Sequence, residues 1–151
     1  YKQDRLTCEP VFSETIIINP KQSVMPNTAT VKPKLGKKVL IVEDEGEMGL
    51  VLNMIFSEKN YQLDYVNNLL SAEEYLHQHE PSLIILDNKL PDGFGVDFIH
   101  YIKKKHPAIK IIMISGLGLA KDVALANGAD MFLEIPFALE EFEEAINRVL
   151  K

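Results

Sequence analysis

The sequence predicts an α/β fold in which a parallel sheet of five strands carries helices on both faces. From residue 39 onward, short apolar runs alternate five times with segments of helical periodicity. Such alternation is typical of parallel strands joined by right-handed helical crossovers. Two of the runs, residues 39–42 and 83–86, are apolar at every position, as expected for strands that are covered on both faces.

The predicted strands are apolar or β-branched runs that end at charged, polar or turn-forming residues. They are residues 39–42, 61–66, 83–86, 109–114 and 131–133. The third run stops abruptly at Asp87, so the third strand is expected to end on a carboxylate. Ligands of open parallel sheets bind at the carboxyl ends of the strands, and function is therefore expected there.

Helices are predicted where apolar residues recur at three- and four-residue spacing. Three of them carry one-sided apolar stripes: Met48, Val51, Leu52, Ile55 and Phe56; then Phe98, Ile99 and Ile102; then Leu139, Phe142, Ile146, Val149 and Leu150. Two more are expected around residues 69–78 and 119–126. Between the third strand and the third helix, the prolines and glycines of residues 91–95 predict a turn.

The chain of 151 residues is long enough for one domain and a tail, but too short for two ordinary domains. Residues 1–36 hold four of the eight prolines and show no helical period. They are predicted to be an N-terminal extension, flexible or loosely docked, and residues 37–151 to be the folded domain. Residues 15–18 are a β-branched run that could form one strand, but a flexible leader is favoured.

Composition argues against several classes of function. The net charge of −6 does not suit a nucleic-acid surface, and the basic run at residues 103–106 is interpreted as a solvated helix end. No apolar run approaches the length of a membrane-spanning helix, and the first residues lack a secretory signal. The lone Cys8 suits a reducing compartment. We therefore expect a cytoplasmic protein that binds neither nucleic acid nor membrane.

Chemically active side chains stand at the predicted strand ends. Glu43 and Asp44 follow the first strand, Asp87 ends the third, and Ser115 ends the fourth. Parallel strands of similar length bring these carboxylates together, and such like charges repel unless a cation lies between them. Mg²⁺ fits because it accepts a few carboxylate oxygens, keeps waters and leaves positions for phosphate oxygens. The cluster predicts a Mg²⁺-dependent phosphoryl site.

Four segments, taken in order, resemble the receiver domains of two-component response regulators, the CheY-like superfamily. They are VLIVEDE at residues 39–45, LIILDNKLPDGFG at 83–95, MISG at 113–116 and GADMFLEIPF at 128–137. The resemblance covers residues 37–151 and none of the tail. It implies a flavodoxin-like (βα)5 three-layer sandwich with strand order 2-1-3-4-5.

The resemblance also implies roles for individual residues. Asp87 is the phosphoacceptor, a nucleophile that forms an acyl phosphate. Mg²⁺ is held by Glu43, Asp44, Asp87 and the backbone carbonyl of Lys89. The domain is not a conventional enzyme, since at most it catalyses its own phosphotransfer and autodephosphorylation.

Further implied roles concern switching and partners. Ser115 matches the hydroxyl that contacts a phosphoryl oxygen, and Phe132 matches the aromatic residue that turns inward when the domain switches. The phosphoryl donor is a histidine kinase or a histidine phosphotransfer protein. A downstream protein binds the last two helices and strand five. A homodimer is also compatible with the resemblance.

One position departs from the family pattern. Receivers carry a lysine before the proline that follows strand five, whereas Ile135 precedes Pro136 here. Isoleucine has neither charge nor donor, so one charge-assisted contact of roughly 1.5–3 kcal/mol is missing. Lys89, the cation near Asp87 in sequence, is a candidate partial substitute.

Functions from different classes therefore remain open. The domain is either a working phosphoacceptor or a degenerate receiver that binds a partner without phosphorylation because Ile135 has broken the switch. A weaker third interpretation is a small phosphatase with an aspartyl nucleophile. Such enzymes usually place that nucleophile after strand one, whereas Asp87 follows strand three.

Overall fold

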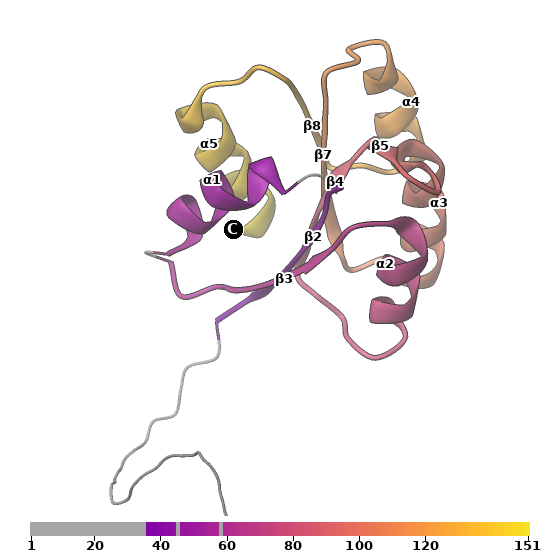
Figure 1. Ribbon diagram of the computed structural model, residues 1–151, viewed down its shortest axis with the longest axis horizontal. Helices are drawn as coiled ribbons and strands as arrows, with labels where there is room; N and C mark the ends of the chain where they lie inside the picture. Colours follow the sequence, from indigo (N-terminus) through magenta and orange to yellow (C-terminus); the bar gives the residue numbers. More distant parts are fainter. Residues whose placement is uncertain (1–35, 45, 58) are drawn as a thin grey trace, which may run out of the picture. The chain divides into compact units, whose positions relative to one another are not determined.

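A parallel sheet forms the centre of the computed structural model, which describes residues 36–44, 46–57 and 59–151. Its strands are β2 Lys38–Val42, β3 Gln62–Val66, β4 Leu83–Asp87, β7 Lys110–Ser115 and β8 Met131–Glu134. They pair in the order β3-β2-β4-β7-β8, and every pairing is parallel (Figure 1). This confirms the expected strand order 2-1-3-4-5. The possible strand at residues 15–18 lies outside the described residues.

Helices cover both faces of this sheet. They are α1 Glu47–Phe56, α2 Leu69–Leu76, α3 Gly95–Lys105, α4 Ala120–Asn127 and α5 Leu139–Leu150. In Figure 1, α1 and α5 lie on one face, and α2, α3 and α4 on the other. Each helix occurs where the apolar spacing predicts it, with differences of one or two residues at the ends. Within the described ranges, no helix has the length and apolar character needed to cross a membrane.

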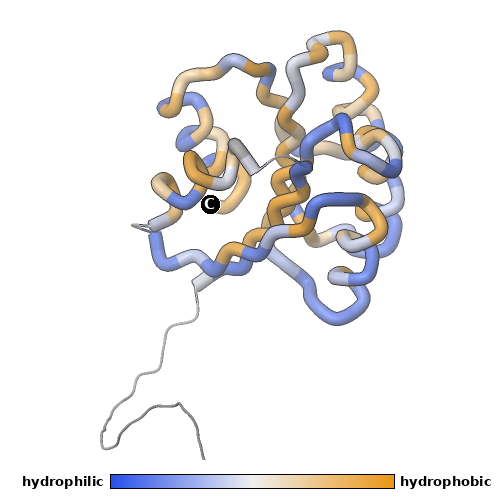
Figure 2. Tube along the Cα trace, in the orientation of Figure 1, coloured by the Kyte–Doolittle hydropathy of each residue, from blue (hydrophilic) through white to orange (hydrophobic). Residues whose placement is uncertain are grey.

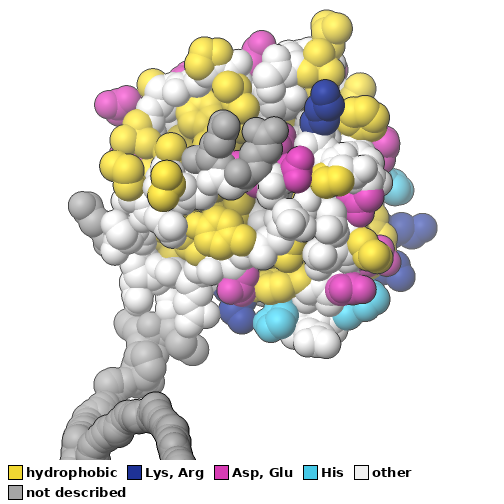
Figure 3. Space-filling view, viewed as in Figure 1, with side chains coloured by type: hydrophobic (Ala, Val, Ile, Leu, Met, Phe, Trp, Pro, Cys, Tyr) yellow, Lys and Arg dark blue, Asp and Glu magenta, His cyan; other side chains and the backbone are white. Residues whose placement is uncertain are grey.

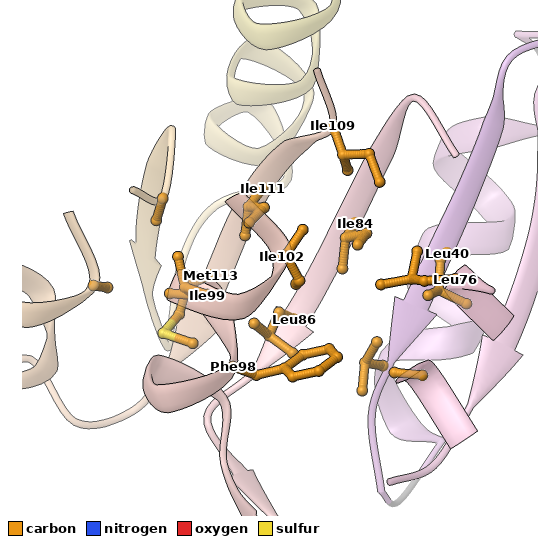
Figure 4. Close-up of a cluster of buried hydrophobic side chains, with 14 of the residues drawn as sticks. Leu40, Leu76, Ile84, Leu86, Phe98, Ile99, Ile102, Ile109, Ile111 and Met113 are labelled. Carbon is orange, nitrogen blue, oxygen red and sulfur yellow. The ribbon is translucent and has the colours of Figure 1, made fainter. Parts of the chain in front are cut away.

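The two faces of the sheet bury two separate apolar cores. Because successive strand residues point to opposite faces, Leu40 and Ile84 pack under α2, α3 and α4 (Figure 4). Their neighbours Ile41 and Ile85 pack under α1 and α5. Figure 2 shows the central strands as hydrophobic along their length. This two-sided burial explains the continuous apolar runs and makes Lys37–Lys151 one compact unit.

The C-terminal end of α3 differs from the prediction at Lys103. Its Nζ donates to the carbonyl of Ile109 at 2.6 Å and lies 3.1 Å from Oδ2 of Asp130. The same Asp130 oxygen accepts a backbone N–H of β7 at 2.9 Å. The interpretation of residues 103–106 as a solvated helix end is therefore wrong for Lys103, although the two lysines after it are exposed. The helix ends against the chain entering β7, where a carbonyl and a carboxylate come within reach of the long side chain.

The predicted turn before α3 contains a small antiparallel hairpin, made of β5 Lys89–Leu90 and β6 Gly93–Phe94. Asp92, at its tip, accepts hydrogen bonds from the N–H groups of Leu69 at 2.8 Å and Leu70 at 3.0 Å. The first N–H groups of a helix lack partners within the helix. The carboxylate of Asp92 therefore caps α2 and holds the hairpin against it.

Close backbone packing positions Asp87. A Cβ at Gly95 would lie 2.3 Å from the carbonyl oxygen of Asp87 and 2.9 Å from Cε of Met113. Beside it, Asn88 is buried, and its Oδ1 accepts the N–H of Val96 at 3.1 Å. The start of α3 thus touches the backbone of Asp87, and only glycine leaves room for this contact.

We expect Gly95→Ala to lower the free energy of unfolding by about 1–3 kcal/mol, because the added methyl group overpacks a rigid site. Urea unfolding would measure it. Gly116→Ala is the matched control, since a Cβ at Gly116 meets nothing within 4 Å and should change stability by less than about 0.5 kcal/mol. Equal stability of the two variants would contradict the close contact.

The capping of α2 by Asp92 should depend on pH. The two backbone N–H bonds, from Leu69 and then Leu70, hold the pKa of the Asp92 carboxyl below its ordinary value. A depressed folded-state pKa gives stability that is present above the ordinary pKa and lost as the pH falls through the folded one. The difference in urea midpoint between the wild type and Asp92→Asn should stay constant from about pH 7 to 5 and shrink below about pH 4. A difference in urea midpoint that stays constant down to about pH 3 would contradict this account.

Candidate functional site

The register of the sheet brings the predicted site residues to one edge. Val42 of β2 pairs with Leu86 of β4, so Glu43 and Asp87 each follow a paired residue. On the other side of β4, Asp87 pairs with Ile114 of β7. The carboxyl ends of three neighbouring strands therefore meet at the same place.

The carboxylates of Glu43, Asp44 and Asp87 line one pocket of about 470 Å³. Lys89 and Ile135 line it too, and the rest of its lining is apolar: Ile41, Val42, Met48, Ile85, Leu90, Pro91 and Ile114. Of the described residues in this lining, Lys89 alone is basic. The pocket therefore combines an acidic end with apolar walls.

Glu43 is held by the start of α1. Its Oε2 accepts the N–H of Met48 at 2.9 Å, whereas its Oε1 is buried without a hydrogen-bond partner among the described residues. Burial raises the pKa of the Tyr65 hydroxyl, and the negative charge of the Glu43 carboxylate raises it further. A buried carboxylate oxygen with no donor is costly, so this corner suits a cation or an ordered water.

The donor set fits a Mg²⁺ ion of the kind that keeps much of its water. In the part of the chain that the structure describes, no three His, Cys, Asp or Glu side chains are gathered closely enough to hold a metal by themselves. Mg²⁺ needs only one or two carboxylates, since waters and phosphate oxygens complete its octahedron. Asp44 and Asp87 line the same pocket as the unpartnered Glu43 oxygen. These residues could supply such a partial shell.

Ser115 lies beside the pocket but is not part of its lining. It is buried, and its Oγ accepts the N–H of Leu117 at 2.9 Å. Its carbonyl accepts the N–H of Ile135 at 2.9 Å, which ties the ends of β7 and β8 together. In this state the hydroxyl is engaged by the loop that leads to α4.

Phe132 lies on β8, paired with Met113, and is half-buried. It lines a second hollow of about 370 Å³ with Lys121, Leu133, Glu134, Ile135, Pro136, Phe137 and Glu141. Ile135 lines both this hollow and the acidic pocket. The structure therefore brings Glu43, Asp44, Asp87, Lys89 and Ile135 together, and places Ser115 and Phe132 just outside that group.

The turn at residues 91–95 was predicted from the sequence, but Asn88 and the contacts that support the site were not. Asn88, Asp92 and Gly95 fix the loop after Asp87 through the contacts described above. A polar residue next to an apolar strand and a glycine opening a helix are weak signals, because both are common in ordinary turns. The role of these residues becomes visible only in the structure, where α2, α3 and the end of β4 lie close together.

Comparison with known proteins agrees with this geometry. A family model described as the response regulator receiver domain matches residues 39–147. Chemotaxis protein CheY of Thermotoga maritima is 33% identical over 121 residues, covering 78% of this chain and 100% of that protein. Phosphate regulon transcriptional regulatory protein PhoB of Escherichia coli is 28% identical over 121 residues. That match covers 78% of this chain but only 53% of PhoB, so the chain spans about half of that relative.

Solved structures show the same fold. The beryllofluoride-activated NtrC4 receiver domain dimer superimposes with a TM-score of 0.70 at 35% identity, covering 75% of this chain and 95% of that chain. The receiver domain of a putative LuxO repressor protein from Vibrio parahaemolyticus gives a TM-score of 0.70 at 26% identity, with coverages of 77% and 91%. From its fold, its strand order and the family match over residues 39–147, we conclude that the chain belongs to the response regulator receiver domains of two-component systems.

Proposed function

We propose that this receiver domain accepts a phosphoryl group on Asp87 while Mg²⁺ is bound in the acidic pocket. The observation that carries the proposal is the shared lining of that pocket, in which Asp87 lies with Glu43 and Asp44. The metal would be held by Glu43, Asp44, Asp87 and the backbone carbonyl of Lys89. When bound, Mg²⁺ would neutralise negative charge on the transferring group.

In the proposed step, a carboxylate oxygen of Asp87 forms a bond to phosphorus as the bond from phosphorus to the donor breaks. The electron pair of the broken bond leaves with the donor atom, which is an imidazole nitrogen when the donor is a phosphohistidine. The contact between Gly95 and the Asp87 carbonyl supports this role, because it fixes the backbone from which the nucleophile projects.

Ser115 and Phe132 are proposed to report the new charge. For this, Ser115 would exchange its bond with the Leu117 N–H for one with a phosphoryl oxygen, which requires the loop before α4 to move. Phe132 is only half-buried and borders a hollow, so it has room to turn inward. Both changes would alter the surface formed by α4, β8 and α5.

We propose that a histidine kinase or a phosphotransfer protein is the donor, and that a downstream protein binds the surface of α4, β8 and α5. Exposed apolar residues support such an interface: Leu119 is 86% exposed, Val123 50% and Leu139 44%. Figure 3 shows hydrophobic side chains gathered over α4, and others over α1 and α5. A homodimer through this surface is also proposed, since the NtrC4 receiver is described as a dimer. The compartment would be the cytoplasm.

A second function is favoured by one observation. Ile135 places an apolar side chain, 42% exposed, in the lining of the acidic pocket. In this alternative the domain is a pseudo-receiver that binds its partner without phosphorylation.

Incubation with acetyl phosphate and Mg²⁺ separates the two functions. We expect intact-mass measurement to show one added phosphoryl group, which hydroxylamine removes because an acyl phosphate is labile. Labelling should be lost in Asp87→Asn and when Mg²⁺ is chelated. Asp122→Asn is the control, because Asp122 is exposed on α4 and does not line the pocket. No labelling of the wild type, or equal labelling of Asp87→Asn, would leave the pseudo-receiver as the better account.

A further inference from the structure

We propose that Lys89 supplies the positive charge that holds the phosphoryl group on Asp87, and that the β5–β6 hairpin carries the signal to the start of α2. This inference rests on the proposed phosphorylation of Asp87. It adds to that function a second residue that senses the phosphoryl charge, besides Ser115, and a second element that moves, besides the loop before α4.

The charge balance of the pocket leads to Lys89. The described lining residues include three carboxylates and a single ammonium group. A phosphoryl group adds about 1.5–2 further negative charges at neutral pH. Ile135, on the β8 side, can offer neither charge nor a hydrogen bond, so Lys89 is the described lining residue able to compensate.

The position of Lys89 suits this role. It is exposed and follows Asp87 by two residues at the start of β5. A lysine side chain is long and carries its three donors on a freely rotating ammonium group, so it can reach an oxygen added at the pocket mouth. Holding such an oxygen would pull β5, and with it the hairpin, towards the pocket.

The hairpin is tied directly to α2. Its tip residue Asp92 accepts the N–H groups of Leu69 and Leu70. Its Leu90 is buried in the same core against which Leu69 packs. A Cβ at Gly93 would lie 3.0 Å from Cδ1 of Leu69. A shift of the hairpin must therefore disturb the first turn of α2, where Leu70 is 61% exposed. That turn would be a second surface that changes on phosphorylation, besides the one formed by α4, β8 and α5.

Titration with beryllofluoride, a phosphoryl analogue, in the presence of Mg²⁺ and followed by amide shifts tests this. Lys89→Ala should weaken beryllofluoride binding about tenfold or more. Ile135→Lys should strengthen it, and the double variant should bind about as tightly as the wild type. Lys104→Ala, which removes a lysine outside the pocket, is the control and should leave the affinity unchanged. A Lys89→Ala affinity within about twofold of the wild type would overturn the proposal.

Mg²⁺ binding without beryllofluoride separates an electrostatic role from a structural one. Removing the Lys89 charge should leave Mg²⁺ affinity unchanged or increase it, because like charges repel. If Lys89→Ala weakens the binding of both Mg²⁺ and beryllofluoride, the role of Lys89 is structural and the proposal fails. In the wild type, the amides of Leu69 and Leu70 should shift on beryllofluoride binding, and in saturated Lys89→Ala these shifts should shrink. Equal shifts would overturn the transmission through the hairpin.

The outcomes also distinguish this inference from the proposed function. If the wild type binds beryllofluoride on Asp87 and Lys89→Ala binds it equally well, only the role of Lys89 is lost. If Ile135→Lys binds it and the wild type does not, Lys89 does not substitute, and the native chain is a pseudo-receiver. If neither binds it, the phosphoacceptor function and the inference fail together.

Discussion

Val42 and Leu86 pair in the parallel ladder between β2 and β4, and the chemistry of the domain depends on this register. Because both strands are buried on both faces, a shift of one residue would move apolar side chains to the wrong core. The same pairing forces Glu43, Asp44 and Asp87 to the edge of one pocket. Apolar burial thus places three carboxylates around one pocket, and among the described residues a buried Glu43 oxygen has no donor. Such a site would gain stability from a bound cation.

The second constraint is the balance of charge around Asp87. Ile135 contributes only apolar surface to the acidic pocket, and it also borders the hollow beside Phe132. Ile135 would therefore offer no charge and no hydrogen bond to a phosphoryl group on Asp87. Lys89 lies instead on the hairpin that Asp92 connects to α2. If Asp87 is phosphorylated as proposed, the electrostatic pull of the phosphoryl group would be directed to the hairpin and α2.

The elements of the fold could be predicted because their signals are local. Apolar runs such as residues 83–86 and the stripe ending at Ile55 and Phe56 depend only on chain periodicity. The convergence of Glu43 and Asp87 followed from the general geometry of parallel sheets. Contacts between distant segments were not predictable in the same way. The ion pair of Lys103 with Asp130 depends on where α3 ends relative to Asp130.

Several contacts of the site could not be predicted from the sequence, because they also join distant segments or depend on a single backbone group. The direction of the Ser115 hydroxyl is set by one backbone N–H in the next loop, which no residue pattern specifies. The hairpin after Asp87 was expected as a turn, and its attachment to α2 through Asp92 joins segments 22 and 23 residues apart. The need for glycine at position 95 comes from one carbonyl oxygen of Asp87. These features arise from tertiary packing.

The most direct test of the account is a crystal structure of the domain with Mg²⁺ and beryllofluoride. We expect beryllofluoride attached to the carboxylate of Asp87, Mg²⁺ coordinated on the side of Glu43 and Asp44, and the ammonium of Lys89 within hydrogen-bonding distance of a fluoride. A pocket that stays empty at saturating ligand would contradict this expectation, as would beryllofluoride bound away from Asp87.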